Sequence, residues 1–123
     1  MRTIFIIEPD KLLAKNYAYE LRAKDRQIIL FSTAAIAIKA LEKVIPDLVV
    51  MELALPAHNG FEFLYEMLSY SDSQKVKVVI NSFVQERDIP FGFINREEMG
   101  IVEYLPKLFT PSKKLAEVVR EHL

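Results

Sequence analysis

Several apolar runs of this sequence end at side chains that carry a charge or a hydroxyl group. These are Glu8 and Asp10 after the first run, Glu52 after the third, Ser82 after the fourth and Lys107 after the fifth. Carboxylates hold cations, an ammonium group holds anions, and a hydroxyl group donates or accepts a hydrogen bond. If the runs are strands that end at one edge of a sheet, these groups form a site. The residue types thus predict where the site lies but not which ligand or reaction it serves.

The stretch around Glu52, LVVMELALPAHNG at 48–60, is the one from which the rest of the chain can be placed. Its apolar run is too short for an isolated helix and too apolar for an edge strand. It therefore indicates a central strand buried on both faces. Glu52 then lies at the carboxyl end of that strand, which is where open α/β sheets keep their binding sites.

Short apolar runs and helix-capping residues predict the remaining elements. The predicted strands are 4–7, 28–31, 48–51, 76–80 and 101–105. The first predicted helix covers 11–23 and is capped by Asp10. The second is capped by Ser32 or Thr33, runs through Val44 and ends before Pro46. Two more begin near Gly60 and at Pro111. In 83–100 we expect only a short or irregular helix, with Asp88 as its cap and Pro90 in its first turn, because Gly92 weakens it.

Strands and helices thus alternate along the whole chain, with no hairpin signal between consecutive strands. Five strands alternating with five helices predict an α/β fold, a doubly wound parallel sheet covered on both faces. No linker, repeat or low-complexity tract interrupts the pattern, and 123 residues suit one domain, 1–123. Right-handed crossovers put the ligand crevice at the carboxyl ends of the strands.

Composition excludes several classes of function. The net charge of −1 argues against nucleic acid or a membrane surface as the main partner. The chain has no cysteine, so it forms no disulfide and no thiolate site. The N-terminal segment MRTIFIIEPD has too short an apolar run for a signal peptide or a membrane span. We expect a soluble, cytoplasmic protein.

Two segments of the chain resemble the receiver domain of two-component response regulators. They are PDLVVMELALPAHNGFEFL at 46–64, which is similar to the phosphoacceptor segment, and YLPKLFTPSKKLAEVVREHL at 104–123, which is similar to the closing strand and helix. The similarity extends from about Ile4 to the C-terminus. It implies a flavodoxin-like (CheY-like) sheet with the strand order 2-1-3-4-5 and a role in phosphorelay signal transduction.

The resemblance also implies roles for single positions. An aspartate at the position of Glu52 accepts a phosphoryl group from a histidine kinase in this family. Two acidic residues that help to hold Mg²⁺ match Glu8 and Pro9, a serine or threonine matches Ser82, and a lysine matches Lys107. Ser82 and Tyr104 match a pair that moves together when receivers are activated, which changes the face formed by the fourth helix, the fifth strand and the fifth helix.

The departures from the family pattern concern the chemistry. Glu52 extends about one carbon further than an aspartate, and Pro9 offers no ligand oxygen, while Asp10 is equally placed to reach the site or to cap the helix. For Mg²⁺ there remain Glu8, Glu52, a backbone carbonyl at Ala54 and water, so we expect weak binding or none. Two further differences are Phe83 and Leu108. Phe83 replaces a small residue and is expected to crowd the pocket. Leu108 replaces a proline, so we expect a trans peptide bond there in place of the cis bond usual in the family.

These residues favour a degenerate receiver that acts by protein interaction and not as an enzyme. Glu52 would place a fixed charge of about −1 where a phosphate carries about −1.5 to −2. The expected partners are a histidine kinase or another signalling protein, with a second copy of the chain bound through the last strand and helix. Three alternatives stay open: a receiver that still accepts phosphate on Glu52 or Asp10, a small phosphohydrolase that uses the carboxylates and Lys107, and a purely structural Glu52–Lys107 ion pair.

The chain ends one helix after the fifth predicted strand. We therefore expect no output module within it, and it is either a single-domain regulator or a receiver cut from a longer protein.

Overall fold

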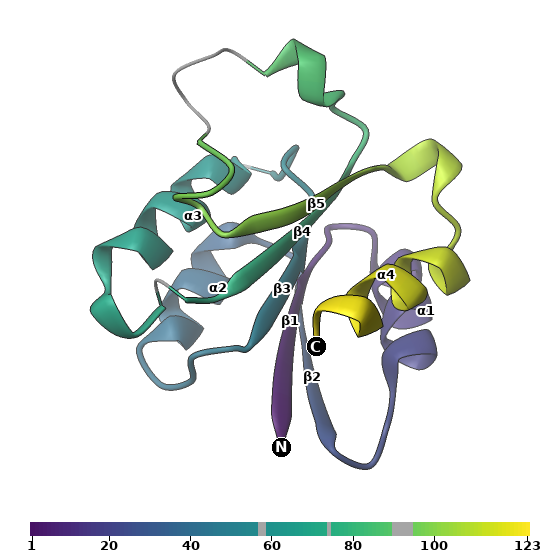
Figure 1. Cartoon of the computed structure of the whole chain (residues 1–123), viewed down its shortest axis with the longest axis horizontal. Helices are drawn as coiled ribbons and strands as arrows, with labels where there is room; N and C mark the ends of the chain where they lie inside the picture. The colour runs from purple at the N-terminus through teal and green to yellow at the C-terminus, as the bar shows by residue number, and fades with distance from the viewer. Residues whose placement is uncertain (57–58, 74, 90–94) are drawn as a thin grey trace.

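The computed structural model describes residues 1–56, 59–73, 75–89 and 95–123. Five parallel strands form one sheet in the order β2-β1-β3-β4-β5 (Figure 1). Their bounds are β1 Arg2–Ile7, β2 Arg26–Phe31, β3 Leu48–Met51, β4 Lys77–Ser82 and β5 Ile101–Pro106. The predicted sheet, its strand order and its parallel pairing are thereby confirmed.

The helices cover both faces of this sheet. They are α1 Lys11–Leu21, α2 Ala34–Leu41, α3 Gly60–Ser69 and α4 Ser112–His122. Short 3₁₀ helices lie at η1 Ser71–Ser73, η2 Glu86–Asp88 and η3 Lys107–Phe109. In Figure 1, α2 and α3 lie on one side of the sheet, and α1 and α4 lie on the other.

The described residues contain four α-helices, so the fifth predicted helix, which was expected to be short or irregular, is not an α-helix there. Between β4 and β5 they hold only η2, and Asp88 is its last residue, so it does not act as an N-cap. The turn begins three residues earlier, at Gln85, whose carbonyl accepts the N–H of Asp88 at 2.9 Å. Pro90 and Gly92, on which part of that prediction rested, lie outside the described residues.

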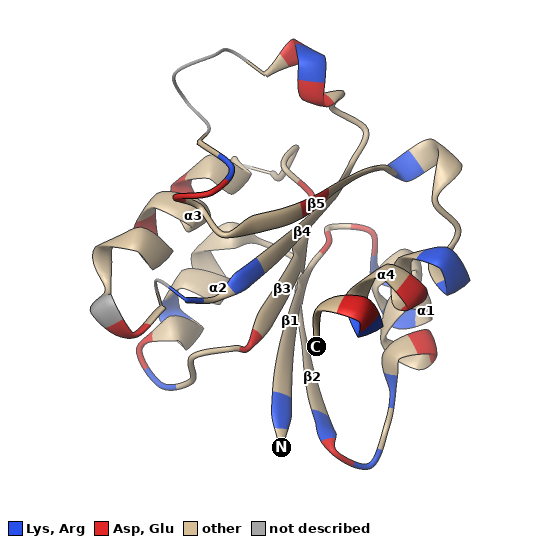
Figure 2. Ribbon diagram, viewed as in Figure 1, with Lys and Arg blue, Asp and Glu red and all other residues tan. Residues whose placement is uncertain are grey.

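Alternation along the strands separates two cores. On β1, the side chains of Phe5 and Ile7 pack with α2 and α3, whereas Ile4 and Ile6 pack with α1 and α4. This period of two is the geometry of an extended chain, and each face then excludes water under its pair of helices. Figure 2 shows charged residues of both signs along the helices and loops, whereas the strand interiors are almost free of them.

Caps set the helix starts near the site. The Asp10 carboxylate accepts the N–H groups of Leu12 and Leu13 at 3.0 and 3.1 Å, which fixes the start of α1 directly after β1. The Thr33 hydroxyl caps α2 in the same way. Two helices end earlier than predicted, α1 at Leu21 and α2 at Leu41. In the described residues no helix is long and apolar enough to cross a membrane.

Candidate functional site

The predicted site residues meet at the carboxyl edge of the sheet. Glu52 directly follows β3, the central strand, and its side chain is almost fully buried. Glu8 follows β1, Ser82 ends β4 and Lys107 follows β5, and all three are buried too. Parallel strands bring these positions together, because their carboxyl ends share one edge.

The Glu52 carboxylate accepts four hydrogen bonds. Its Oε2 atom accepts the hydroxyl of Ser82 and the N–H of Ala54, the latter at 3.1 Å. Its Oε1 atom accepts the N–H of Phe83 at 3.2 Å and the Lys107 ammonium at 3.1 Å. An ionised carboxylate has about four acceptor sites, so donors of this chain fill all of them. Ala54 was expected to offer its carbonyl to a metal, and here it is the N–H group that faces Glu52.

Lys107 connects two carboxylates. Its Nζ atom lies 2.5 Å from Glu8 Oε1 and 3.1 Å from Glu52 Oε1, and its side chain is only 4% exposed. The other oxygen of Glu8 accepts the N–H of Asp10 at 3.0 Å. The ion pair of Glu52 with Lys107 was anticipated from the sequence, and the shorter one with Glu8 was not.

Electrostatics keep Glu52 and Lys107 charged. Burial disfavours the charged form of Glu52, but the hydrogen bonds from Ser82, Ala54 and Lys107 outweigh it and hold the pKa of the carboxyl below its usual range. For Lys107, burial acts against the ammonium form, yet the bonds to Glu8 and Glu52 raise its pKa above the ordinary lysine value. Glu52 and Lys107 are therefore both ionised at neutral pH.

Hydrogen bonds extend from Glu52 to the fifth strand. The N–H of Val84 donates to the Ser82 hydroxyl at 3.0 Å, and the Tyr104 hydroxyl donates to the Val84 carbonyl at 2.6 Å. Burial, followed by the charges of Glu52 and Glu86, raises the pKa of Tyr104 to about 12. Ser82 and Tyr104, the predicted switch pair, are thus linked through one residue of the backbone.

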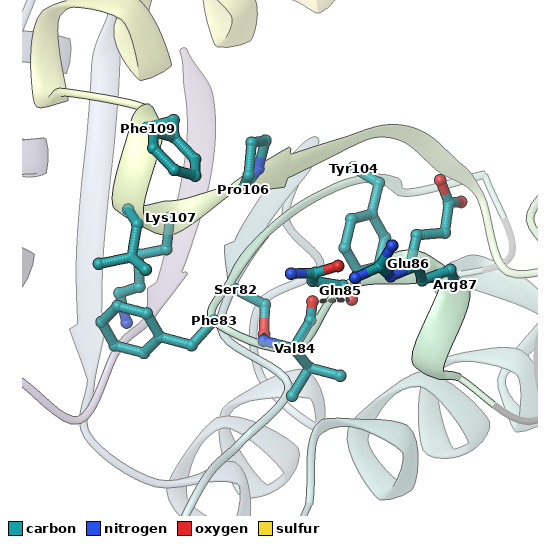
Figure 3. A pocket seen from close by; sticks show the side chains of 11 residues that line it. Ser82, Phe83, Val84, Gln85, Glu86, Arg87, Tyr104, Pro106, Lys107 and Phe109 are labelled. Atoms are coloured by element: carbon teal, nitrogen blue, oxygen red, sulfur yellow. Dashed lines mark hydrogen bonds between the residues drawn. The ribbon is translucent and has the colours of Figure 1, made fainter.

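A groove of about 450 Å³ opens between the segment after β4 and the end of β5. Figure 3 shows Tyr104 on one side of it and Phe83 with Lys107 on the other. The Phe83 ring lies 4.6 Å from Lys107 Nζ and is 57% exposed. It therefore lies over the lysine, at the edge of the groove that it was expected to crowd.

Asp10 does not join the acidic cluster through its side chain. That carboxylate is bound to the first turn of α1, and the residue is exposed. Of the two roles left open for Asp10, the structure shows the helix cap. Pro9, next to it, contributes no side-chain oxygen.

A second buried polar pair, not predicted from the sequence, lies behind the site. Asn81 Nδ2 donates to the Tyr17 hydroxyl at 3.1 Å, and both side chains are buried. Burial, followed by the charge of Glu8, raises the pKa of Tyr17. Alternation along β4 was the available signal, because it turns Asn81 to the opposite face from Ser82, toward α1.

The family described as the response regulator receiver domain matches residues 4–120 of this chain. The chain belongs to the response regulator receiver domain family. Receiver domains are signalling modules of two-component systems and interact with histidine kinases and other signalling proteins. The resemblance noted in the sequence is thereby confirmed.

Two curated relatives and one solved structure illustrate the likeness. Protein-glutamate methylesterase/protein-glutamine glutaminase 2 of Oleidesulfovibrio alaskensis is 28% identical, and the match covers 91% of this chain and 31% of that protein. Transcriptional regulatory protein CreB of Escherichia coli is 23% identical, with 94% and 48% covered. The BeF3-activated DrrB receiver domain superposes with a TM-score of 0.78 at 20% identity, covering 99% of this chain and 97% of that one.

This chain spans between about a third and a half of the length of these curated relatives. The methylesterase activity in the name of the first is that of the whole protein, of which this chain matches only 31%. The second relative is named a transcriptional regulator, so membership of the family does not argue against a nucleic-acid partner. The expectation that this chain binds no nucleic acid rests on its net charge alone.

The donors at this site do not fit the Mg²⁺ ion that the family resemblance implies. One oxygen of Glu8 and one of Glu52 are bound to Lys107, and their other oxygens accept N–H and O–H groups of the chain. Magnesium needs nearly octahedral oxygen ligation, with oxygens about 2.0–2.1 Å away. Among the described residues, no group of three or more His, Cys, Asp or Glu could hold a metal ion.

Proposed function

We propose that this chain is a cytoplasmic pseudo-receiver, a protein-interaction module in which the Glu52 carboxylate stands in for a phosphorylated aspartate. The observation that supports it is the set of four hydrogen bonds on that carboxylate. An ammonium, a hydroxyl and two backbone N–H groups gathered at one point form an anion site. Here the anion is a side chain of the protein itself.

The hydrogen bonds beyond Glu52 suggest how the fixed charge would act. Glu52 holds the Ser82 hydroxyl, which accepts the N–H of Val84, and the carbonyl of Val84 holds Tyr104. The aromatic side chain on β5 is thus tied to the anion through three hydrogen bonds. This would keep the domain in one arrangement without a phosphorylation step, at a charge of about −1 compared with about −1.5 to −2 for a phosphate.

Phosphate acceptance by the same residue is the weaker alternative. Ser82 and Lys107 already form hydrogen bonds with the two oxygens of Glu52. A phosphoryl group attached to either oxygen would displace the partner that binds it. Phosphoryl transfer depends on placement to within about an ångström, and the longer side chain alters it. Asp10 is no better acceptor, because its carboxylate is bound to the first turn of α1.

The phosphohydrolase alternative has little support from the site. Glu8, the acidic residue at the end of β1, is paired with Lys107 and accepts the N–H of Asp10. A carboxylate with both oxygens engaged is a poor nucleophile. We therefore propose no enzymatic activity for this chain.

The partners proposed are a histidine kinase or another signalling protein. A homodimer through the face of the last strand and helix is a further proposal. In the described residues that face lacks an α-helix between β4 and β5, where only η2 is present. A dimer contact on this side would therefore involve β5 and α4.

Beryllofluoride with Mg²⁺ provides the test, because it mimics a phosphoryl group on an aspartate. We expect no saturable binding to the wild type, measured by fluorine NMR, and no phosphoryl adduct after acetyl phosphate, measured by intact mass. The matched comparisons are Glu52→Asp and the double variant with Pro9→Asp. A phosphoryl adduct located on Glu52, or a saturable beryllofluoride complex of the wild type, would refute the proposal. Binding by Glu52→Asp alone would show that Pro9 and Phe83 matter less than the length of the Glu52 side chain.

A further inference from the structure

A buried polar pair joins the end of β4 to helix α1. Asn81 Nδ2 donates to the Tyr17 hydroxyl at 3.1 Å, and the two side chains are only 2% and 3% exposed. In the described part of the chain, the Oδ1 atom of Asn81 is buried without a hydrogen-bond partner. An unpaired buried oxygen lowers stability, and two apolar side chains would fill this place without that cost. The pair is therefore better explained by what it connects than by stability.

The end of β4 links this pair to Glu52. Asn81 and Ser82 are consecutive residues of the strand, so their side chains point to opposite faces of the sheet. The Ser82 hydroxyl donates to Glu52, while the Asn81 amide donates to Tyr17 in the second turn of α1. A shift of this strand end would therefore act on both hydrogen bonds at once.

A second connection reaches the start of the same helix. Glu8 binds the Lys107 ammonium through Oε1 and the N–H of Asp10 through Oε2. The Asp10 side chain in turn caps α1. Since Lys107 also binds Glu52, at 3.1 Å, helix α1 is attached to the site at its first turn as well as at Tyr17.

The Tyr17 hydroxyl also lies within the electric field of the site. Burial, followed by the charge of Glu8, raises the pKa of Tyr17, and the charges of Lys107 and Glu52 act on it as well. A change in the charge of Glu52 would therefore alter the free energy of the Tyr17 hydroxyl even without a hydrogen bond between the two.

We infer that Asn81 and Tyr17 are positioning residues that couple the Glu52 site to helix α1, so that a change in the charge or bonding of Glu52 alters this helix. The coupling makes α1 a second element, besides β5 with Tyr104, on which the state of the site acts. It does not depend on the proposed function, because it holds whether Glu52 remains a carboxylate or accepts a phosphoryl group.

A double-mutant cycle tests the coupling. Glu52→Gln and Tyr17→Phe are measured singly and together by urea denaturation. Tyr19→Phe is the matched control, because it removes the hydroxyl of an exposed tyrosine on the same helix. Substitutions at sites that do not interact change the unfolding equilibrium constant additively, to within about twofold.

We expect the effect of Tyr17→Phe on the unfolding constant to differ by more than about twofold between the wild type and the Glu52→Gln background. The effect of Tyr19→Phe should be the same in both. Effects of Tyr17→Phe that agree to within about twofold would overturn the inference.

Amide chemical shifts distinguish this coupling from a merely structural role. In Glu52→Gln, the ¹H–¹⁵N shifts of α1 should change more than those of α2, which lies on the other side of the sheet (Figure 1). Adding Tyr17→Phe should reduce the change in α1. Changes in α1 that are no larger than in α2, or that Tyr17→Phe leaves unaltered, would refute the inference. If Glu52→Gln does not fold, Ser82→Ala replaces it in both measurements, because it removes one bond to Glu52 and keeps the charge.

Discussion

At the scale of single residues, the site is set by the ionisation of Glu52. Four donors hold its carboxylate, and three of them, Ser82, Ala54 and Lys107, outweigh the effect of burial on its pKa. Two of these donors are backbone N–H groups, of Ala54 and Phe83. Backbone donors have no signature in the amino-acid types, which is why the sequence predicted Lys107 and Ser82 near Glu52 but neither of these N–H groups.

The first prediction concerns pH. The pKa of Glu52 in the folded chain is below its ordinary value of 4.5, so its carboxylate stabilises the fold fully above that pH. This contribution is lost as the pH falls through the lowered pKa of the folded state. At pH 7 the free energy of unfolding of Glu52→Gln should be about 3 kcal/mol lower than that of the wild type. This difference in free energy should shrink as the pH falls below about 4.5.

Urea titrations at several pH values measure this effect. Glu117→Gln is the control, because Glu117 forms an exposed pair with Lys114 at 3.7 Å, and its removal should change stability by less than about 0.5 kcal/mol. A difference between Glu52→Gln and the wild type that stays constant down to pH 3 would contradict the assigned direction of the pKa shift.

At the scale of elements, the apolar runs were sufficient to predict the five strands, and the capping residues Asp10 and Thr33 gave the starts of two helices. The segment after Ser82 was harder. Asp88 has the side chain of a cap, but nothing in its type reveals that the turn already begins at Gln85. The backbone conformation defines where a helix begins, and the type of residue only makes that conformation more favourable.

Asp10 supplies the prediction at this scale. If its role is to cap α1, Asp10→Ala should lower the free energy of unfolding by about 1 kcal/mol, whereas Asp10→Asn should lower it by only a few tenths, since asparagine caps equally well. Chemical denaturation of the three proteins measures this. Equal losses for alanine and asparagine would indicate that the charge of Asp10, and not its hydrogen bonds, stabilises the chain.

At the scale of the whole molecule, the order of the strands decides which of them are protected. β3 is hydrogen-bonded on both sides, and all of its residues are buried. β2 and β5 are the edges of the sheet, and most of their residues are at least partly accessible. This order came from the family resemblance, because apolar runs alone do not specify which strands are neighbours.

Amide hydrogen exchange provides the prediction at this scale. The amides of β3 should exchange most slowly, through global unfolding, with β1 and β4 close to them. Amides in β2 and β5 should exchange faster, because an edge strand can open without the rest of the sheet. Exchange in β5 as slow as in β3 would contradict this order and would indicate that another chain covers that edge in solution.

The bonds that hold Glu52 have a consequence for the timing of a signal. A phosphorylated aspartate loses its phosphate, so a working receiver returns to rest at the rate of that hydrolysis. Under the proposed function, the anion of this chain is a carboxylate that synthesis supplies and only degradation removes. Output would then follow the amount of protein in the cell, and control would pass from phosphorylation to expression and proteolysis.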